Sequence, residues 1–350
     1  MKKISRAIII ACAAVLLLFS CKTTESGSGS QLVAVKSSKT EKLSYAQRVR
    51  SIPAKNFDSY AFSPETDLIH RLQEAPDFFL DYLKEMDGNP SYTSYSPDGT
   101  ERFIIEFALQ NLPPRFTSIL EERLLGIYFV NDFLGSGMAD FVLDEDNNLY
   151  YTLTFNPKVL TMSMTELVSY RENTCFIQDD PSLSIEVQLS DEAPGFFYIL
   201  MHETAHIFDY QEHETPFVEP GLKELAAHTP ESTPFTQGVW SDYHILADGD
   251  RFPYTGRISF YGMGEGPSIP ISEAAGVYRS LESLPIASLY GTKSWAEDFA
   301  EMMTFLYLTE HMQIGYRIVI KQDWEEYNSW EPMLSPKVQK RADILRPLFF

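Results

Sequence analysis

The apolar residues of this chain follow two periodicities, and the change from one to the other divides the sequence. Before residue 190, several short apolar runs are bounded by turn residues, as is typical of β-strands. In residues 139–155, two such runs flank Asp146-Asn147-Asn148 and predict a β-hairpin. Residues 182–189 predict another strand.

Helical spacing dominates after residue 190. A long apolar run at 194–211 predicts one helix, and residues 294–312 predict a second, with apolar residues recurring on one face. The recurring residues are Phe299, Met302, Met303 and Leu306. Further segments with helical patterns after residue 190 are 272–283 and 335–348. Two helical segments, 44–87 and 112–124, also lie among the predicted strands of the earlier part.

This order of elements predicts an α+β domain over residues 45–350, with a mixed sheet beside a central helix and a mostly helical C-terminal half. Residues 44–87 contain a plausible helix cap at Ser63 and a helix end at Asp87-Gly88. Residues 207–290 hold many prolines and glycines, so we expect a long, loop-rich insertion there.

The N-terminus has the pattern of an export signal. Three cations among the first six residues precede the apolar run 7–19, which is too short to span a bilayer comfortably. The run ends in Leu18-Phe19-Ser20-Cys21, which resembles the lipobox of bacterial lipoproteins. The resemblance implies a signal peptide at 1–20 and acylation of Cys21, and the alternatives are an ordinary signal peptide or an uncleaved anchor.

The sequence after the signal predicts a tethered protein of the bacterial cell envelope, held at the outer membrane or the cell surface. Residues 21–44 are rich in Ser, Thr, Gly and Lys, as in a flexible tether. Of the three cysteines, only Cys175 then stays free, so no intramolecular disulfide is expected. The net charge of −21 argues against binding nucleic acid, and we expect a monomer.

The helix predicted at 194–211 contains the sequence His-Glu-Thr-Ala-His. His202 and His206 are four residues apart and therefore share one helix face, where both imidazoles can reach one Zn²⁺. This HExxH pattern resembles the zincin metallopeptidases, in which the glutamate, here Glu203, takes a proton from water as general base. The alternative is a core helix whose histidines are merely hydrogen-bonded.

A catalytic zinc needs a third protein ligand, and one zincin class takes it from the extended pattern HExxHxxGxxH. Here the glycine position holds Asp209 and the last position holds Glu212, while His213 comes one residue too late. That class is therefore disfavoured, even if Asp209 or Glu212 served as the third ligand in place of a histidine.

A better third ligand lies in the segment Glu297-Asp298-Phe299-Ala300-Glu301, where two glutamates share a helix face. The segment resembles the gluzincins, in which a glutamate from a later helix completes the zinc site. The resemblance implies that Glu297 is the ligand and that Glu301 hydrogen-bonds a ligand histidine. The alternative is a solvated acidic helix face. The separation of 91 positions from His206 to Glu297 would be explained by the insertion.

A finer resemblance is to gluzincins of the anthrax lethal factor type, which place a tyrosine seven residues before the ligand glutamate. Tyr290 has that spacing from Glu297. The resemblance implies that its hydroxyl stabilises the oxyanion formed when water attacks a peptide carbonyl. His244, His228 and Tyr261 are rival donors. Residues 149–155 offer an exposed strand edge for substrate, with ordinary core packing as the alternative.

Together these patterns predict a lipid-anchored, zinc-dependent peptidase with a zincin-like domain, acting on a peptide or protein substrate. Its zinc is held by His202, His206 and Glu297, and Glu203 is the general base. The first alternative is a non-catalytic binding module with a zincin fold. The second is a structural envelope lipoprotein in which zinc only stabilises the fold, with four protein ligands and no open position.

Overall fold

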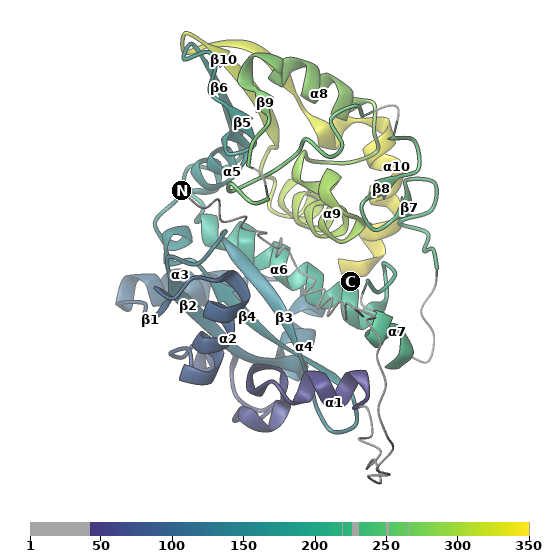
Figure 1. Ribbon diagram of the computed structural model, residues 1–350. Helices are drawn as coiled ribbons and strands as arrows, with labels where there is room; N and C mark the ends of the chain where they lie inside the picture. The colour runs from purple at the N-terminus through teal and green to yellow at the C-terminus, as the bar shows by residue number, and fades with distance from the viewer. Residues whose placement is uncertain (1–42, 219, 226–230, 250–251, 265, 350) are drawn as a thin grey trace, which may run out of the picture.

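A computed structural model describes residues 43–218, 220–225, 231–249, 252–264 and 266–349. The predicted signal peptide, Cys21, His228 and almost all of the predicted tether lie outside these residues. Figure 1 shows two parts stacked on either side of helix α6 (Gly195–Glu212): a sheet with the earlier helices below, and the later helices above. The fold is mixed α and β, as predicted.

The lower part is built on a four-stranded mixed sheet in the order β1-β2-β4-β3. β2 and β4 are parallel, and the other two pairs are antiparallel. The strands are β1 (Thr93–Tyr95), β2 (Leu124–Asn131), β3 (Gly137–Leu143) and β4 (Leu149–Phe155). The predicted hairpin is therefore confirmed, but β4 lies inside the sheet. The outer strands are β1 and β3, and residues 149–155 are packed inside the sheet, which is the second of the two alternatives that the sequence left open.

Both faces of this sheet are covered, because side chains of β2 alternate between two cores. Ile127 and Phe129 join the main core on the side of α6, while Tyr128 and Val130 join a smaller core under α2 (Asp77–Asp87). The other helices of the lower part are α1 (Tyr45–Arg50), α3 (Gly99–Gln110) and α4 (Pro114–Arg123). The sheet is thus a rigid platform beneath α6.

The expected cap at Ser63 does not start a helix. The residues that follow form only the short 3₁₀ turn Leu68–Arg71, and α2 begins after Pro76. Proline lacks an N–H group and disfavours a helical residue before it, which stops α2 from extending toward the N-terminus. The predicted end is confirmed, since Gly88 adopts a left-handed conformation with φ 63°.

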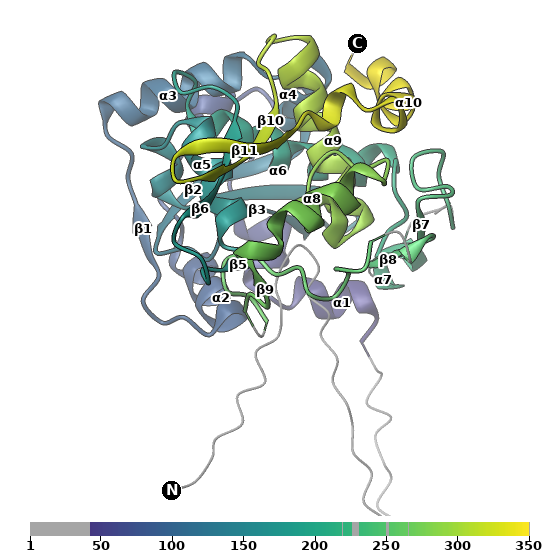
Figure 2. The same ribbon diagram turned by 90° about the horizontal axis from the view of Figure 1, so that it is seen from above.

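The prediction of a mostly helical C-terminal half is wrong in one segment. The strands β10 (Arg317–Gln322) and β11 (Glu325–Trp330) form an antiparallel hairpin, and β10 pairs with β6 (Leu183–Gln188). Figure 2 shows this yellow hairpin crossing the upper part. Its turn uses Asp323 and Trp324, both with positive φ, where a glycine or asparagine is the usual signal. Because the turn lacks the usual residues, the sequence pattern did not predict this hairpin.

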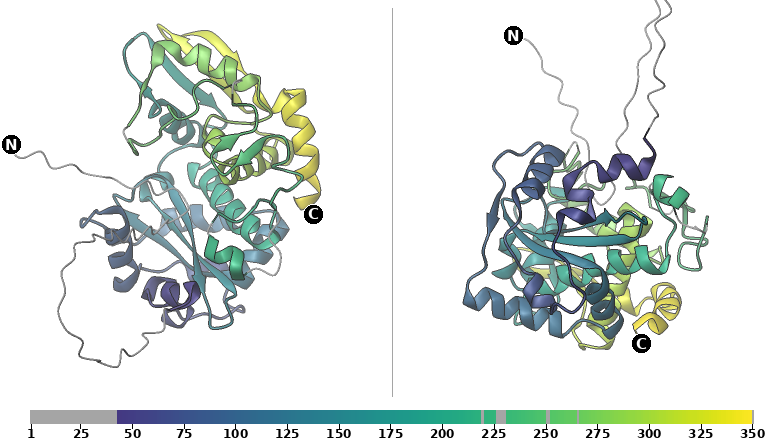
Figure 3. Two further views of the ribbon diagram at one scale, coloured as in Figure 1. Left: turned by 45° about the vertical axis from the view of Figure 1, so that its right-hand side comes forward. Right: turned by 90° about the horizontal axis from the view of Figure 1, so that it is seen from below.

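The remaining elements of the upper part surround α9 (Trp295–Glu310), which packs against α6. Figure 3 shows the two helices side by side between the parts. The other helices of the upper part are α5 (Met164–Asn173), α8 (Ala274–Glu282) and α10 (Pro336–Leu345), while the short helix α7 (Pro220–Leu225) lies with the lower part in Figure 1. The short strands are β5 (Phe176–Ile177), β7 (Trp240–Asp242), β8 (Ile245–Leu246) and β9 (Ile269–Pro270). In the described part of the chain, no helix has the length and apolar character needed to cross a membrane.

Candidate metal centre

Helix α6 carries the HExxH sequence and is buried along most of its length. No side chain caps the start of this helix, because Pro194 itself is the N-cap and makes no side-chain bond. Instead, the N–H of Gly195 donates to the carbonyl of Met162 at 2.8 Å. A Cβ at Gly195 would lie 3.0 Å from the carbonyl oxygens of Met162 and Ser163, so only glycine allows this close approach.

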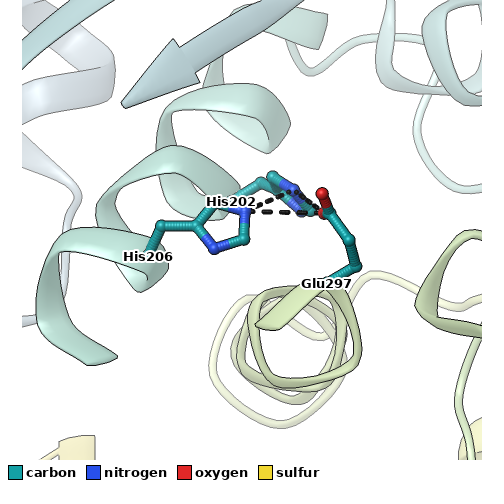
Figure 4. Close-up of side chains that lie close together, drawn as sticks. All are labelled: His202, His206 and Glu297. Carbon is teal, nitrogen blue, oxygen red and sulfur yellow. Dashed lines mark hydrogen bonds and ion pairs between the residues drawn. The ribbon is translucent and has the colours of Figure 1, made fainter. Parts of the chain in front are cut away.

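The three residues expected to bind the metal come together. The Nε2 atoms of His202 and His206 are 3.2 Å apart, and Oε2 of Glu297 lies 3.1 Å from the first and 3.5 Å from the second. One ligand atom from each residue lies within 4.8 Å of the others. Figure 4 shows the two imidazoles of α6 and the carboxylate of α9 pointing toward one another.

Glu297 reaches this position because α9 begins just before it. The hydroxyl of Ser294 accepts a hydrogen bond from the N–H of Glu297 and caps the helix. Glu297 therefore lies in the first turn of α9, where the positive end of the helix dipole favours a carboxylate. The side chain is 6% exposed, so this anion lies in a largely dry site.

Burial and the close contacts shift the acid–base properties of this cluster. Burial would lower the pKa of His202, but hydrogen bonds to Glu297 and Glu301 raise it to about 10. Burial would raise the pKa of Glu297, but hydrogen bonds from the two histidines lower it to about 2. The carboxylate is therefore ionised, and the site requires positive charge beside it, from a proton or from a metal ion.

Glu301 lies one turn further along α9 and holds the outer side of His202. Its Oε1 is 3.0 Å from Nδ1 of His202. Arg171 donates to both of its oxygens, at 3.0 and 2.8 Å, and the hydroxyls of Tyr198 and Ser288 donate as well. Although burial opposes it, the charge of Arg171 lowers the pKa of Glu301 well below its usual range. A charged, immobile carboxylate thus fixes the ring of His202.

Sequence reasoning missed these three supports of Glu301. Tyr198 precedes His202 by four residues on the same helix, so the helical repeat was a usable signal. Arg171 and Ser288 come from α5 and from the loop before Tyr290, and nothing in the sequence around them indicates a role.

Glu203 faces the sheet beside the metal cluster. Its Oε2 accepts a hydrogen bond of 2.8 Å from the N–H of Ala139 on β3. Burial raises the pKa of Glu203, while the neighbouring His202 and His206 oppose that shift. A Cβ at Gly137 would lie 2.9 Å from Ile199 and 3.1 Å from Cγ of Glu203. Glycine at the start of β3 therefore lets the strand lie directly against the acid.

The structure places some of the proposed oxyanion donors in the pocket and another outside it. Tyr290 lines the same pocket as the metal cluster, with its ring 5.8 Å from that of His202 and 4.6 Å from the guanidinium of Arg171. Tyr261 lines this pocket too. His244 is an exposed residue whose Nδ1 bonds the carbonyl of Lys293. Among the described candidates, only the two tyrosines line the pocket that contains the cluster of His202, His206 and Glu297.

The alternative third ligands point elsewhere. Both carboxylate oxygens of Asp209 accept hydrogen bonds from Thr215, from its N–H and from its hydroxyl, each at 2.6 Å. Glu212 pairs with Arg115 at 2.8 Å. Helix α6 ends when His213 adopts a left-handed conformation, with φ 59°. Neither acid belongs to the cluster that holds Glu297.

The donor set suits a borderline metal ion. Two imidazole nitrogens and one carboxylate oxygen are ligands that Zn²⁺ takes in catalytic sites, and a carboxylate on the outer nitrogen of a ligand histidine is its usual support. No known protein family, curated protein or solved structure matches the chain. Function is therefore inferred from the residues of the site itself.

Proposed function

We propose that this protein is a zinc-dependent peptidase of the gluzincin type, with a zincin-like domain and a lipid anchor at Cys21 in a bacterial cell envelope. The observation that carries the proposal is the convergence of His202, His206 and Glu297 in the lining of a pocket that also contains Glu203. Three protein ligands beside a pocket leave room for substrate, whereas a purely structural zinc site would be closed by a fourth.

The chain's own residues supply the acid–base chemistry. When bound, zinc acts as a Lewis acid that makes water easier to deprotonate and polarises the substrate carbonyl. Glu203 accepts the proton from water on a carboxylate oxygen and passes it to the leaving amine. Burial raises its pKa toward neutrality, which suits both transfers. The hydroxyl of Tyr290, or that of Tyr261, donates to the developing negative charge.

The free edge of β3 suits a peptide substrate. In β3, the N–H of Ala139 points to Glu203 and therefore away from β4, and the preceding residues Gly137 and Met138 line the pocket. An extended peptide can add to this edge as another strand, with its backbone beside Glu203.

The test compares wild type with Glu203→Gln on a mixed peptide library, with and without a chelator. We expect zinc-dependent cleavage by wild type and a loss of about 10²–10⁴-fold in the variant, because only the proton transfer is removed. Glu212→Gln, a change of the same kind on the same helix but outside the cluster, is the matched control. Cleavage by Glu203→Gln at the wild-type rate would contradict the mechanism.

The second candidate, a non-catalytic module with the same fold, is distinguished by the same experiment. It predicts zinc binding by both proteins and cleavage by neither. The raised pKa of Glu203 and its place in the pocket favour the enzyme, since a binding module needs no such acid.

A further inference from the structure

The edge of β3 is closed at both of its ends. β4 occupies one side of β3, so a substrate strand can use only the other side. At the C-terminal end of β3, that other side is already taken, because Asn56 forms a parallel bridge with Leu143. The preceding residue, Lys55, is ion-paired with Asp140 and lies 4.3 Å above the ring of Phe141. The segment after α1 therefore covers this end of the edge.

At the N-terminal end of β3, the two walls of the pocket touch. Ser136, just before the strand, and Tyr261, from the loop-rich insertion, have their hydroxyl oxygens 3.1 Å apart, a hydrogen-bond distance. Neighbouring strands need about 4.7–4.9 Å between their backbones, so no peptide passes between these two groups.

The wall that carries Tyr261 is fixed in place. The N–H of Tyr261 donates to Oγ1 of Thr174 at 3.0 Å, and Lys293 donates to the carbonyl of Ile258 at 2.9 Å. Tyr261 has φ 57°, a conformation that a residue with a side chain adopts only when its surroundings impose it. The ring therefore points across the pocket because of these anchors.

The opposite wall is fixed as well. The backbone N–H of Asn156 donates to the carbonyl of Ser136 at 3.0 Å, and its side chain donates to the carbonyl of Phe133 at 2.8 Å. The N–H of Leu134 donates to the hydroxyl of Tyr92 at 3.0 Å. Since the backbones of both walls are anchored, the contact between the side chains of Ser136 and Tyr261 limits the length of the groove.

From these closures we propose that the site takes short peptides and excludes extended segments within long or folded chains. The proposal rests on the peptidase function proposed above. Between the two closures, the uncovered part of β3 runs from Gly137 to Ala139, because Lys55 covers Asp140 and Phe141. At about 3.3 Å per residue, this stretch matches roughly three residues of an extended peptide. A longer chain must bend away at Tyr261 or at Asn56, and it loses strand pairing there.

The test uses a series of peptides of about four to twenty residues that share one cleavage site from the library experiment. For wild type, we expect kcat/KM to be highest for the shortest peptides and to fall by about tenfold or more at twenty residues, because longer chains meet the closures at both ends of the edge. Tyr261→Gly removes the ring, and glycine accepts the local backbone conformation, so the variant is expected to fold. Its ratio of long-peptide to short-peptide kcat/KM should rise about tenfold.

Ser136→Ala is the second variant, because it removes the hydroxyl contact from the other wall and should raise the same ratio by a smaller factor. Tyr170→Ala, a change of an exposed neighbouring ring outside the pocket, is the control and should leave the ratio unchanged. A ratio that does not respond to Tyr261→Gly, or an equal loss of kcat/KM at every length, would overturn the proposal while leaving the peptidase function standing. Absence of cleavage at every length by wild type would instead remove the peptidase function.

Discussion

Helix α9 buries two neighbouring acids, Glu297 and Asp298, in opposite kinds of surroundings. Asp298 faces α10, where Arg341 is ion-paired with it at 2.7 Å and donates a hydrogen bond of 3.1 Å, and the indole N–H of Trp240 in β7 donates another at 2.8 Å. Glu297 faces α6, where its partners are the imidazoles of His202 and His206. The first acid has a permanent cation, and the second has partners whose positive charge depends on a proton.

This difference separates a structural acid from a binding site. Burial raises the pKa of Asp298 despite the opposing charge of Arg341, and the pair is closed by neighbouring side chains. The pKa of Glu297 is lowered to about 2 against the effect of burial, and its carboxylate lines a pocket. A metal ion is the cation that satisfies Glu297 without requiring the histidines to hold protons.

The largest expected effect separates these two acids directly. Asp298→Asn should lower the free energy of unfolding by about 3–5 kcal/mol, with or without zinc, because it leaves the guanidinium of Arg341 buried beside a neutral group. Glu297→Gln should instead abolish the stabilisation that added zinc gives to wild type. Denaturant unfolding with zinc and with a chelator measures both. Zinc-dependent stabilisation that survives Glu297→Gln but not Asp298→Asn would reverse the assignment.

Asp209 differs from both Asp298 and Glu297, since it is buried and its hydrogen-bond donors, the N–H and hydroxyl of Thr215, are neutral. Burial raises its pKa from 3.8 to about 6, so the folded protein binds more protons than the unfolded chain between these values. The free energy of unfolding must therefore fall as pH rises from about 4 to 6, by up to about 3 kcal/mol from this group.

Asp209→Asn removes that titration. The free energy of unfolding of wild type minus that of the variant should fall as pH rises over this range and be constant above about pH 7. Glu212→Gln, whose side chain is paired with Arg115 at the surface, is the control. A difference that is the same at pH 4 and pH 7 would show that burial of Asp209 has no effect on its ionisation.

A smaller effect is expected at Glu301, which resembles Asp298 in its arginine partner and Glu297 in its contact with a histidine. Glu301→Gln should weaken zinc binding about 10–100-fold, because the ring of His202 loses its charged support. Competition with a chromophoric chelator measures the dissociation constant. Glu310→Gln, at the exposed end of the same helix, should bind zinc as wild type does, and equal affinity in both variants would remove the supporting role of Glu301.

The sequence allowed the local part of the site to be predicted, because helical spacing alone puts His202 and His206 on one face of α6. Glu297 was found only through the resemblance of its segment to a known motif. Arg171 could not be found, because its role depends on a side-chain contact with Glu301, which lies 130 residues further along the chain. The β10–β11 hairpin was missed for a local reason, since Asp323 and Trp324 make an uncommon turn.

The position of β3 at the edge of the sheet could not be predicted from the sequence either. The hairpin of β3 and β4 was predicted from alternation and turn residues, but which strand lies outside depends on the parallel pairing of β2 with β4. A pattern within one segment carries no information about that pairing. The bridge from Asn56 and the contact between Ser136 and Tyr261 likewise join segments that are far apart in the sequence.

The most direct test of the metal site is the metal content of the purified protein, measured by mass spectrometry for wild type, His206→Ala, Glu203→Gln and His244→Ala. We expect about one equivalent of zinc per chain in wild type, Glu203→Gln and His244→Ala, and almost none in His206→Ala, which lacks one of the ligands. Wild type without zinc after dialysis against a zinc-containing buffer, or His206→Ala with a full equivalent, would contradict the assignment of His202, His206 and Glu297 as a metal centre.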